Sequence, residues 1–453
     1  MKILDSFLRW LTIYCAKLHF KYVTSASPLR DSVPVSGKVI GPEELANMID
    51  ASLDMWLTAG RFSQQFELEL SHVMGHRFCL AVNSGSSANL LAITALKSPL
   101  LGNKKLVEGD EIITVAAGFP STISPIIQNG FIPVFVDVNR SGNILCNQLE
   151  LAVTPKTKAI FVAHTLGNPF DIQSVMSFAK AHHLFVIEDN CDALGALVDG
   201  QLTGTFGDMC TLSFYPAHHI TTGEGGAVLT SDPLFNKILL SLRDWGRDCW
   251  CDPGCDNTCK NRFGWSVGSL PKGYDHKYIY SHLGYNLKMT DWQAAIGVAQ
   301  LKRLSHFVEL RKKHYLFLYE RLQKYERFFN ISTSFAGAEP SWFGFLMSVK
   351  PNAPFSRLDV VTFLEANGIA TRQLFAGNFL RHPACVRSRF ALRILNSGIL
   401  YSDELTEDDF THLPETDSIM MHSFWLGVWP GLTDANLVKI TEVFAQFCER
   451  YDA

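Results

Sequence analysis

Short apolar runs alternate with helical patterns from Arg77 to about Ser231, and this alternation restricts the fold more than any other feature of the chain. Strands separated by helices build a mainly parallel sheet with helices on both faces. In such sheets, ligands bind beyond the carboxyl ends of the strands. The predicted strands are Phe78–Asn83, Glu111–Ala116, Pro133–Val138, Ala159–His164, Leu184–Asp189, Cys210–Tyr215 and Ala227–Ser231, with helices at Ser86–Lys97, Ser121–Gln128 and Ile172–His182 between them.

Size and charge exclude several classes of protein. The 453 residues include 40 Lys and Arg against 44 Asp and Glu, which gives a net charge of −4 and no electrostatic signature of nucleic-acid binding. The apolar stretch 7–20 is interrupted by Arg9 and Lys17 and is shorter than the ~20 apolar residues of a membrane span, so it predicts an amphipathic surface helix. No signal-peptide cleavage site follows it. We expect a cytoplasmic protein with neither nucleic acid nor a membrane as partner.

The chain is long enough for two or three domains at roughly 150 residues each. An N-terminal helical segment is expected over residues 1–34, followed by a large domain over 35–289 that includes a cysteine-rich loop, 247–281. A long helix over 290–329 is expected to link this domain to a smaller α/β domain, 330–453.

Three segments at the predicted strand ends contain residues suited to ligand binding or catalysis. Small and hydroxyl residues over 83–87 open a helix, where backbone N–H groups suit a phosphate, although an ordinary helix cap explains them as well. Asp189 ends a buried strand, where it suits the protonated nitrogen of a pyridine ring or simply caps the next element. His218 and His219 precede a glycine-rich turn and are candidate acid–base groups, although a lone histidine is more often structural.

The cysteines are the most unusual feature of the composition. There are eleven, an odd number, which argues against a disulfide framework in a reducing compartment. Four lie within eleven residues and look like metal or cluster ligands: Cys249, Cys251, Cys255 and Cys259. A local zinc site made by these four remains an alternative, although they lack the usual paired spacing.

Several segments together resemble one family. They are 83–89, 109–114, 133–137, 188–189, 213–226 and 284–286, in this order. The series resembles the pyridoxal-phosphate-dependent sugar aminotransferases, the DegT/DnrJ/EryC1/StrS family, over about residues 35–450. The resemblance implies the aspartate-aminotransferase-like α/β fold (fold type I), with a mainly parallel seven-stranded sheet in the large domain and a smaller C-terminal α/β domain.

One departure from the family pattern changes the expected chemistry. The family has Ser-Phe-x-Pro-x-Lys, whose Lys forms the Schiff base with the cofactor, and His218 occupies that position here. Imidazole cannot form a stable imine, so the cofactor is expected to be held noncovalently as pyridoxamine 5′-phosphate. This substitution resembles the pyridoxamine-dependent sugar 3-dehydratases and implies that His218 is the catalytic acid–base group, with His219 as the runner-up.

The cysteine spacing resembles one branch of these dehydratases. That branch, which forms 3,6-dideoxysugars from 4-keto-6-deoxyglucose, carries a [2Fe–2S] cluster on the pattern Cys-x57-Cys-x-Cys-x7-Cys. The same spacing occurs here in Cys191, Cys249, Cys251 and Cys259, so the resemblance implies that these are the cluster ligands. It also implies a separate NADH-dependent flavin and iron–sulfur reductase as partner. Cys255 is left as a possible substitute ligand.

The resemblance also implies a cofactor site. Gly85, Ser86 and Ser213 would bind the phosphate, Phe119 would stack on the ring, and Asp189 would pair with the pyridine nitrogen. Core packing is the alternative for Phe119. Asn286 would reach the phosphate in a partner subunit, which implies a homodimer. Relatives often have Gln and His where this chain has Asp192 and Leu194, so contacts to the cofactor 3-hydroxyl are expected to differ.

The resulting hypothesis is an enzyme that removes the C3 hydroxyl of a nucleotide-linked 4-keto-6-deoxyhexose, through a pyridoxamine phosphate adduct that is then reduced through the cluster. The substrate expected is CDP-4-dehydro-6-deoxy-D-glucose, and the resemblance implies a product for lipopolysaccharide O-antigen. The alternatives are a dTDP-sugar dehydratase, a cluster-free dehydratase, a sugar aminotransferase and a zinc-stabilised scaffold without activity. Candidate sugar or diphosphate contacts are Lys272, Tyr274, His276, Arg372 and Asn378.

Overall fold

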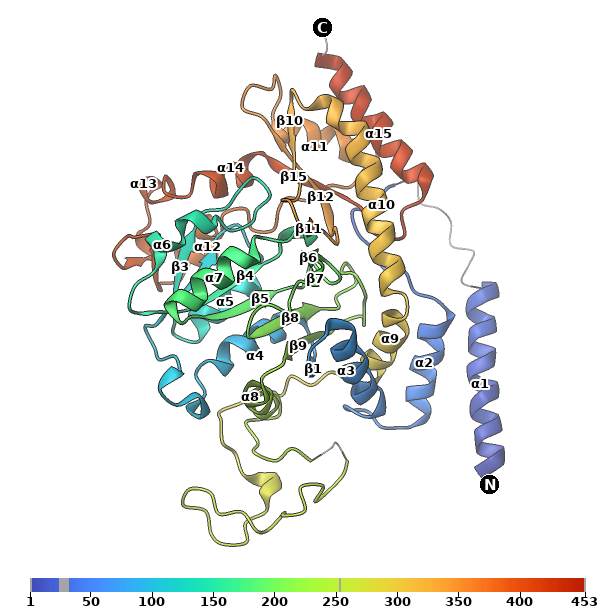
Figure 1. Cartoon of the computed structure of the whole chain (residues 1–453). Helices are drawn as coiled ribbons and strands as arrows, with labels where there is room; N and C mark the ends of the chain where they lie inside the picture. The colour runs from blue at the N-terminus through green and yellow to red at the C-terminus, as the bar shows by residue number, and fades with distance from the viewer. Residues whose placement is uncertain (1, 24–31, 252–253, 452–453) are drawn as a thin grey trace.

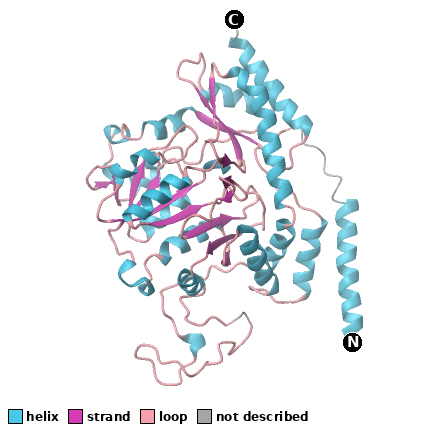
Figure 2. Cartoon of the chain, viewed as in Figure 1, coloured by secondary structure: helices cyan, strands magenta, loops and turns pink. Residues whose placement is uncertain are grey.

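A computed structural model describes residues 2–23, 32–251 and 254–451. Its centre is a nine-stranded sheet with helices on both faces (Figures 1 and 2). In spatial order the strands are β1 (Phe78–Val82), β9 (Gly226–Thr230), β8 (Met209–Ser213), β5 (Phe185–Asp189), β4 (Thr157–Ala163), β2 (Glu111–Val115), β3 (Ile132–Val136), β13 (Ala391–Ile394) and β14 (Leu400–Tyr401). All seven strands predicted from the sequence are confirmed.

The middle of the sheet, from β8 to β13, is parallel, while β9 pairs antiparallel with both β1 and β8. The strands are almost entirely buried because helices cover both faces. These helices include α4 (Gly85–Ala95), α5 (Pro120–Gln128), α6 (Leu149–Ala152), α7 (Ile172–His182) and α8 (Pro233–Arg243). The carboxyl ends of β2, β4, β5 and β8 therefore meet at one edge.

Two strands that the sequence did not predict extend this sheet. β13 and β14 belong to residues 330–453, which were expected to form the small domain, yet β13 lies parallel beside β3. The buried Arg393 of β13 donates to Glu111 of β2 at 2.9 Å, so an ion pair joins the two parts of the chain. The short helices α12 (Pro383–Arg387), α13 (Glu407–Phe410) and α14 (Pro414–His422) surround this extension.

A smaller layer stands beside the large sheet. Its antiparallel sheet contains β10 (Phe329–Ile331), β12 (Gly344–Val349) and β15 (Ser423–Gly427), and it packs with α10 (Leu304–Leu322), α11 (Arg357–Ala366) and α15 (Asp434–Cys448). The predicted linking helix is interrupted at residues 302–303, between α9 (Asp291–Leu301) and α10. A third small sheet pairs β11 (Ala338–Glu339) with β6 (Leu197–Val198) and β7 (Gln201–Leu202).

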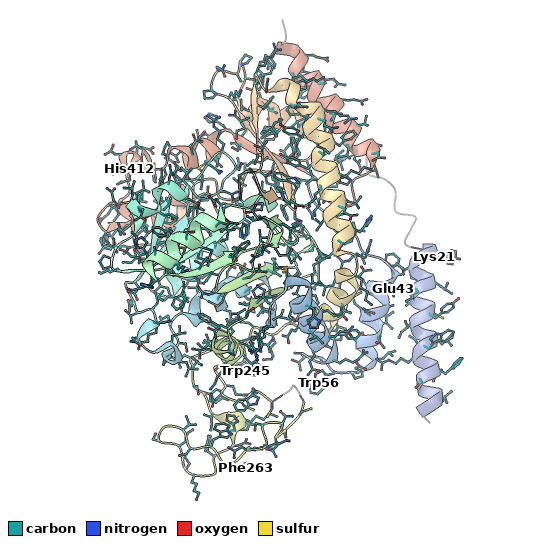
Figure 3. The ribbon with its side chains drawn as sticks, in the orientation of Figure 1. Lys21, Glu43, Trp56, Trp245, Phe263 and His412 are labelled. Atoms are coloured by element: carbon teal, nitrogen blue, oxygen red, sulfur yellow. The ribbon has the colours of Figure 1, made fainter. Side chains whose placement is uncertain are left out.

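The N-terminal part forms three helices, α1 (Lys2–Val23), α2 (Pro42–Leu53) and α3 (Arg61–Met74). The predicted surface helix is confirmed: α1 lies against α2 (Figure 1), and Glu43 of α2 faces it (Figure 3). Lys17 of α1 donates to Glu43 at 2.7 Å. Residues 24–31 of the predicted N-terminal segment lie outside the described residues. None of the helices in the described ranges is long and apolar enough to cross a bilayer.

Candidate active site

A cavity of about 890 Å³ lies at the carboxyl edge of the large sheet. Its walls come from the predicted strand ends and from the smaller layer. Eight candidate site residues from the sequence line it: Gly85, Ser86, Phe119, Asp189, Cys191, Ser213, His218 and Arg372. The smaller layer contributes Phe343, Arg357, Arg372 and Trp425, among others. Such a volume is typical of a small-molecule site.

The N-terminus of α4 forms one corner of the cavity. Ser84 caps the helix, since its hydroxyl oxygen accepts from the N–H of Ser87 at 3.0 Å. The N–H groups of Gly85 and Ser86 belong to the first turn, which lacks acceptors within the helix and attracts anions. A Cβ added at Gly85 would lie 2.4 Å from the Cβ of Ser213, so glycine is required for this close approach. The corner fits a phosphate.

Asp189 lies on the floor of the cavity and is only 5% exposed. Its carboxylate accepts from the side chains of Asn89 at 2.9 Å and Thr122 at 2.7 Å, and from the N–H of Cys191 at 3.2 Å. Three donors thus converge on this one carboxylate. A buried anion held this way fits a protonated ring nitrogen.

Phe119 directly precedes α5 as its N-cap residue, and it lines the cavity. The residue is 52% exposed and meets Phe375 edge to face, with ring centroids 5.8 Å apart. The ring is therefore not part of the buried core, which was the alternative considered from the sequence. An exposed ring at a cavity wall is suited to stacking on a planar ligand.

His218 follows β8, and its imidazole lines the cavity. Its ring centroid lies 5.3 Å from that of Phe343, and its Nδ1 lies 3.5 Å from Oδ1 of Asp192. Burial, together with the Arg311 guanidinium, lowers the pKa of His218 to about 3. The imidazole is thus neutral at neutral pH, which is the form that accepts a proton.

Arg311 supports the turn that carries His218. From α10, its guanidinium donates to the carbonyl oxygens of Ala217 at 3.2 Å, His218 at 3.0 Å and Trp342 at 3.2 Å. It is fully buried. The sequence analysis missed this residue, because one cationic residue in a helical pattern does not differ from a solvated face.

Asp192 is a second acid at the cavity. Burial, and to a lesser degree the Asp189 carboxylate, raises the pKa of Asp192 to about 8. The sequence marked Asp192 only as a departure from the family. Its position three residues after Asp189, at the end of a parallel strand, was the available signal.

Several candidates do not line this cavity. His219 is buried, with Nε2 2.8 Å from the carbonyl oxygen of Ser341. Asn378 is buried and donates to Asp417 at 2.7 Å, and His276 is buried beside Asp248. Lys272 and Tyr274 are also outside the cavity lining, and Asn286, which is exposed, accepts from Lys288 at 2.6 Å.

The cysteine-rich loop leaves the body below α8, with Trp245 near its base and Phe263 far out (Figure 3). An aromatic cluster holds it together: the rings of Trp250, Trp265 and His276 lie 4.6–5.5 Å apart between centroids. Residues 252–253 of the loop lie outside the described residues.

The four predicted cluster ligands are not gathered into one site. Cys191 lines the central cavity, whereas Cys249 and Cys251 line a second cavity beside α3 and α8. Burial opposes thiolate formation at Cys251, but hydrogen bonds from Thr258, the Cys259 backbone and both neighbouring thiols lower its pKa to about 7. Within residues 2–23, 32–251 and 254–451, no group of three or more His, Cys, Asp or Glu side chains is arranged to hold a metal ion. Cys191, two residues beyond β5, therefore lies apart from the three cysteines of the loop in this structure.

We compared the chain with known protein families and with proteins of known structure. The sequence model of the DegT/DnrJ/EryC1/StrS aminotransferase family matches residues 39–445. The chain belongs to this family. The predicted family and fold are thereby confirmed.

Relatives within the DegT/DnrJ/EryC1/StrS family include named dehydratases. The chain is 52% identical over 416 residues to the lipopolysaccharide biosynthesis protein RfbH of Salmonella typhimurium, covering 92% of this chain and 91% of the relative. It is 46% identical over 427 residues to dTDP-4-dehydro-2,6-dideoxy-D-glucose 3-dehydratase of Saccharopolyspora spinosa, covering 94% and 88%. A solved structure of GDP-4-keto-6-deoxy-D-mannose-3-dehydratase from E. coli, with bound hydrated PLP, superposes with a TM-score of 0.78 at 26% identity and covers 90% of this chain and 98% of that one.

Family membership confirms the prediction of an enzyme of the sugar-nucleotide dehydratase and aminotransferase group that uses pyridoxal or pyridoxamine phosphate. The cavity fits that cofactor, with a phosphate corner at α4, a carboxylate at Asp189 and an exposed ring at Phe119. The individual residue roles stay predictions.

Proposed function

We propose that the protein is a pyridoxamine-phosphate-dependent 3-dehydratase of a nucleotide-linked 4-keto-6-deoxyhexose. The observation that carries this proposal is the identity of residue 218, in the turn that follows β8. A neutral imidazole, His218, lines the cavity at the position of the family lysine, and no lysine is present among the described residues of the cavity lining. Without a nearby amine the cofactor stays noncovalent, and its own amine remains available.

When bound, pyridoxamine phosphate supplies an amine for the C4 carbonyl of the sugar and an electron sink for the charge left when a carbon loses its proton. Gly85, Ser86 and Ser213 bind the phosphate, and Asp189 holds a proton at the ring nitrogen. His218 accepts a proton from the C4′ carbon of the cofactor and returns one to the C3 hydroxyl, which leaves as water. The ring of Phe343 lies beside this base.

The proposed nucleotide is CDP, on the strength of the cysteine spacing. The names of the relatives mention dTDP- and GDP-linked sugars, and these are the competing substrates. A role in lipopolysaccharide synthesis is supported by the name of the Salmonella relative.

The test is to incubate the protein, purified without oxygen and loaded with pyridoxamine phosphate, with CDP-, dTDP- and GDP-linked 4-keto-6-deoxyhexoses. Dithionite supplies the two electrons that reduction of the dehydrated adduct requires, and NMR follows the sugar carbons. We expect loss of the C3 hydroxyl with the CDP sugar. A parallel reaction with pyridoxal phosphate and glutamate tests the rival: formation of a 4-amino sugar would make the protein an aminotransferase and overturn the proposal.

The finer proposal, a [2Fe–2S] cluster reduced by a separate NADH-dependent flavin and iron–sulfur reductase, rests on the cysteine spacing. Protein purified without oxygen is expected to contain about two irons per chain, with broad visible absorption that dithionite bleaches. Cys191→Ser should remove this absorption, while the matched variant Cys255→Ser should keep it. Colourless, iron-free wild-type protein would indicate a cluster-free dehydratase. Bound zinc without cofactor absorption would indicate the remaining alternative, a zinc-stabilised protein of this fold without enzymatic activity.

A homodimer is proposed because Asn286 is exposed and absent from the cavity of its own chain. Light scattering is expected to give twice the mass of 50.6 kDa. Asn286→Ala should weaken cofactor binding in the intact dimer. A monomer that binds the cofactor fully would contradict this role.

A further inference from the structure

Two arginines of the smaller layer line the central cavity without an acidic partner. Arg357 begins α11, and Arg372 lies in the segment that bridges to β15 at Trp425. Among the described residues, neither guanidinium forms an ion pair with a carboxylate; Arg357 is partly buried and Arg372 is exposed. Two uncompensated cations therefore face one cavity.

The contacts of Arg357 hold its guanidinium in place but leave its charge unbalanced. Its Nε donates to the carbonyl oxygen of Met421 at 3.1 Å. In the orientation that satisfies both groups, the side-chain oxygen of Gln373 accepts from both terminal nitrogens of Arg357. Both acceptors are neutral, and burial lowers the pKa of Arg357, so an anionic ligand would offset the cost of its partial desolvation.

An acid of this wall makes hydrogen bonds to another residue. Glu365 also lines the cavity, but its carboxylate accepts from the N–H of Thr371 at 2.6 Å and from the hydroxyl of Thr371 at 2.9 Å. Arg372 donates to the carbonyl of Thr371 at 2.7 Å, which orients its side chain. Glu365 thus holds Thr371, the residue before Arg372, by hydrogen bonds. It forms no ion pair with Arg372 itself.

The cavity therefore has two separate places for anions. One is the corner at α4, from the large sheet, which suits the cofactor phosphate. The other is the arginine wall, Arg357 and Arg372, from the smaller layer. Guanidinium groups match phosphate oxygens with paired hydrogen bonds. The volume of about 890 Å³ leaves space for a second ligand beside a cofactor.

We propose that Arg357 and Arg372 bind the diphosphate of the nucleotide-sugar substrate. This inference rests on the proposed function, because it places the substrate in the same cavity as the cofactor. It assigns the nucleotide end of the substrate to the smaller layer and the reacting sugar to the side of His218. Since the diphosphate is common to CDP, dTDP and GDP sugars, the arginine wall contributes affinity and not the choice of base.

The test measures binding of CDP to protein saturated with pyridoxamine phosphate, so that the cofactor corner is filled. Calorimetry on Arg357→Met and Arg372→Met is expected to give CDP dissociation constants raised by about 10- to 100-fold, as charged hydrogen bonds are lost. Inorganic pyrophosphate should lose affinity in parallel, while cytidine should bind equally to all forms. Arg357→Lys should recover part of the loss.

Arg389→Met is the matched control, because Arg389 is exposed, pairs with Asp403 and Glu404 and is absent from the cavity lining. Thermal unfolding checks that each variant is folded, and cofactor absorption checks that each is loaded. CDP binding as tight in both methionine variants as in the wild type would overturn the inference, even if the enzyme turns over. Wild-type protein that binds CDP through these arginines but forms no 3-deoxy product would overturn the proposed function instead.

Discussion

Replacing His218 with Asn is expected to lower kcat by about 10²- to 10⁴-fold, the usual contribution of an acid–base group. Asn preserves a polar side chain of similar size but cannot take up a proton. The cofactor contacts at Gly85, Asp189 and Ser213 are untouched, so the pyridoxamine absorption band and its binding constant should stay near those of the wild type. Rapid-mixing absorption and steady-state turnover measure both quantities.

The adjacent histidine supplies the control for this experiment. His219 hydrogen-bonds to the carbonyl of Ser341 and is absent from the cavity lining. His219→Asn should therefore retain turnover, although it can lose stability. If His219→Asn is inactive and His218→Asn is active, the assignment of the base is reversed.

Asp189→Asn is expected to weaken cofactor binding by about 10- to 100-fold, since a charged hydrogen bond to a protonated ring nitrogen is exchanged for a neutral one. Turnover should fall further, because an unprotonated ring is a poorer electron sink. The binding constant of pyridoxamine phosphate, followed by absorption, measures the first effect. The second is measured as kcat at saturating cofactor.

A substitution at Glu188, the neighbouring acid on β5, is the control that distinguishes loss of cofactor binding from general destabilisation of the strand. Its carboxylate accepts from the N–H groups of Gly204, Phe206 and Gly207, and it meets His164 at 3.0 Å. Glu188→Gln should lower the free energy of unfolding by about 1–3 kcal/mol and leave the cofactor affinity of folded protein unchanged. Equal loss of cofactor affinity in both variants would show that Asp189 has no special role.

The seven central strands of the large sheet, and the meeting of several candidate site residues at its carboxyl edge, were predictable from the sequence. Strands such as 185–189 are continuous apolar runs because both faces of a parallel sheet are covered, and their polar ends must meet at one edge. Gly85, Asp189 and His218 therefore converge as expected. β13 was not predictable in the same way, because four residues that pair with a strand more than 250 positions away carry no local signal of their partner.

Arg311, Asp192 and Arg357 show where sequence reasoning ends. A charged residue in a helical pattern is usually solvated, and only the packing of α10 against the His218 turn identifies Arg311 as buried. Arg357 at the start of α11 reads as an ordinary surface residue until β15 and the 372–373 segment place it in the cavity wall.

The sequence by itself determined the family, the positions of the seven central strands along the chain and the replacement of the family lysine by His218, because each depends on local composition and spacing. Tertiary structure alone decided which charges face the cavity and how the cysteines are distributed between it and the loop. The spacing of Cys191 and the loop cysteines matches a known pattern, but spacing does not specify distance in space. The positions of these charged residues and cysteines depend on burial and on contacts with residues distant in the chain. A local sequence pattern contains no information about either.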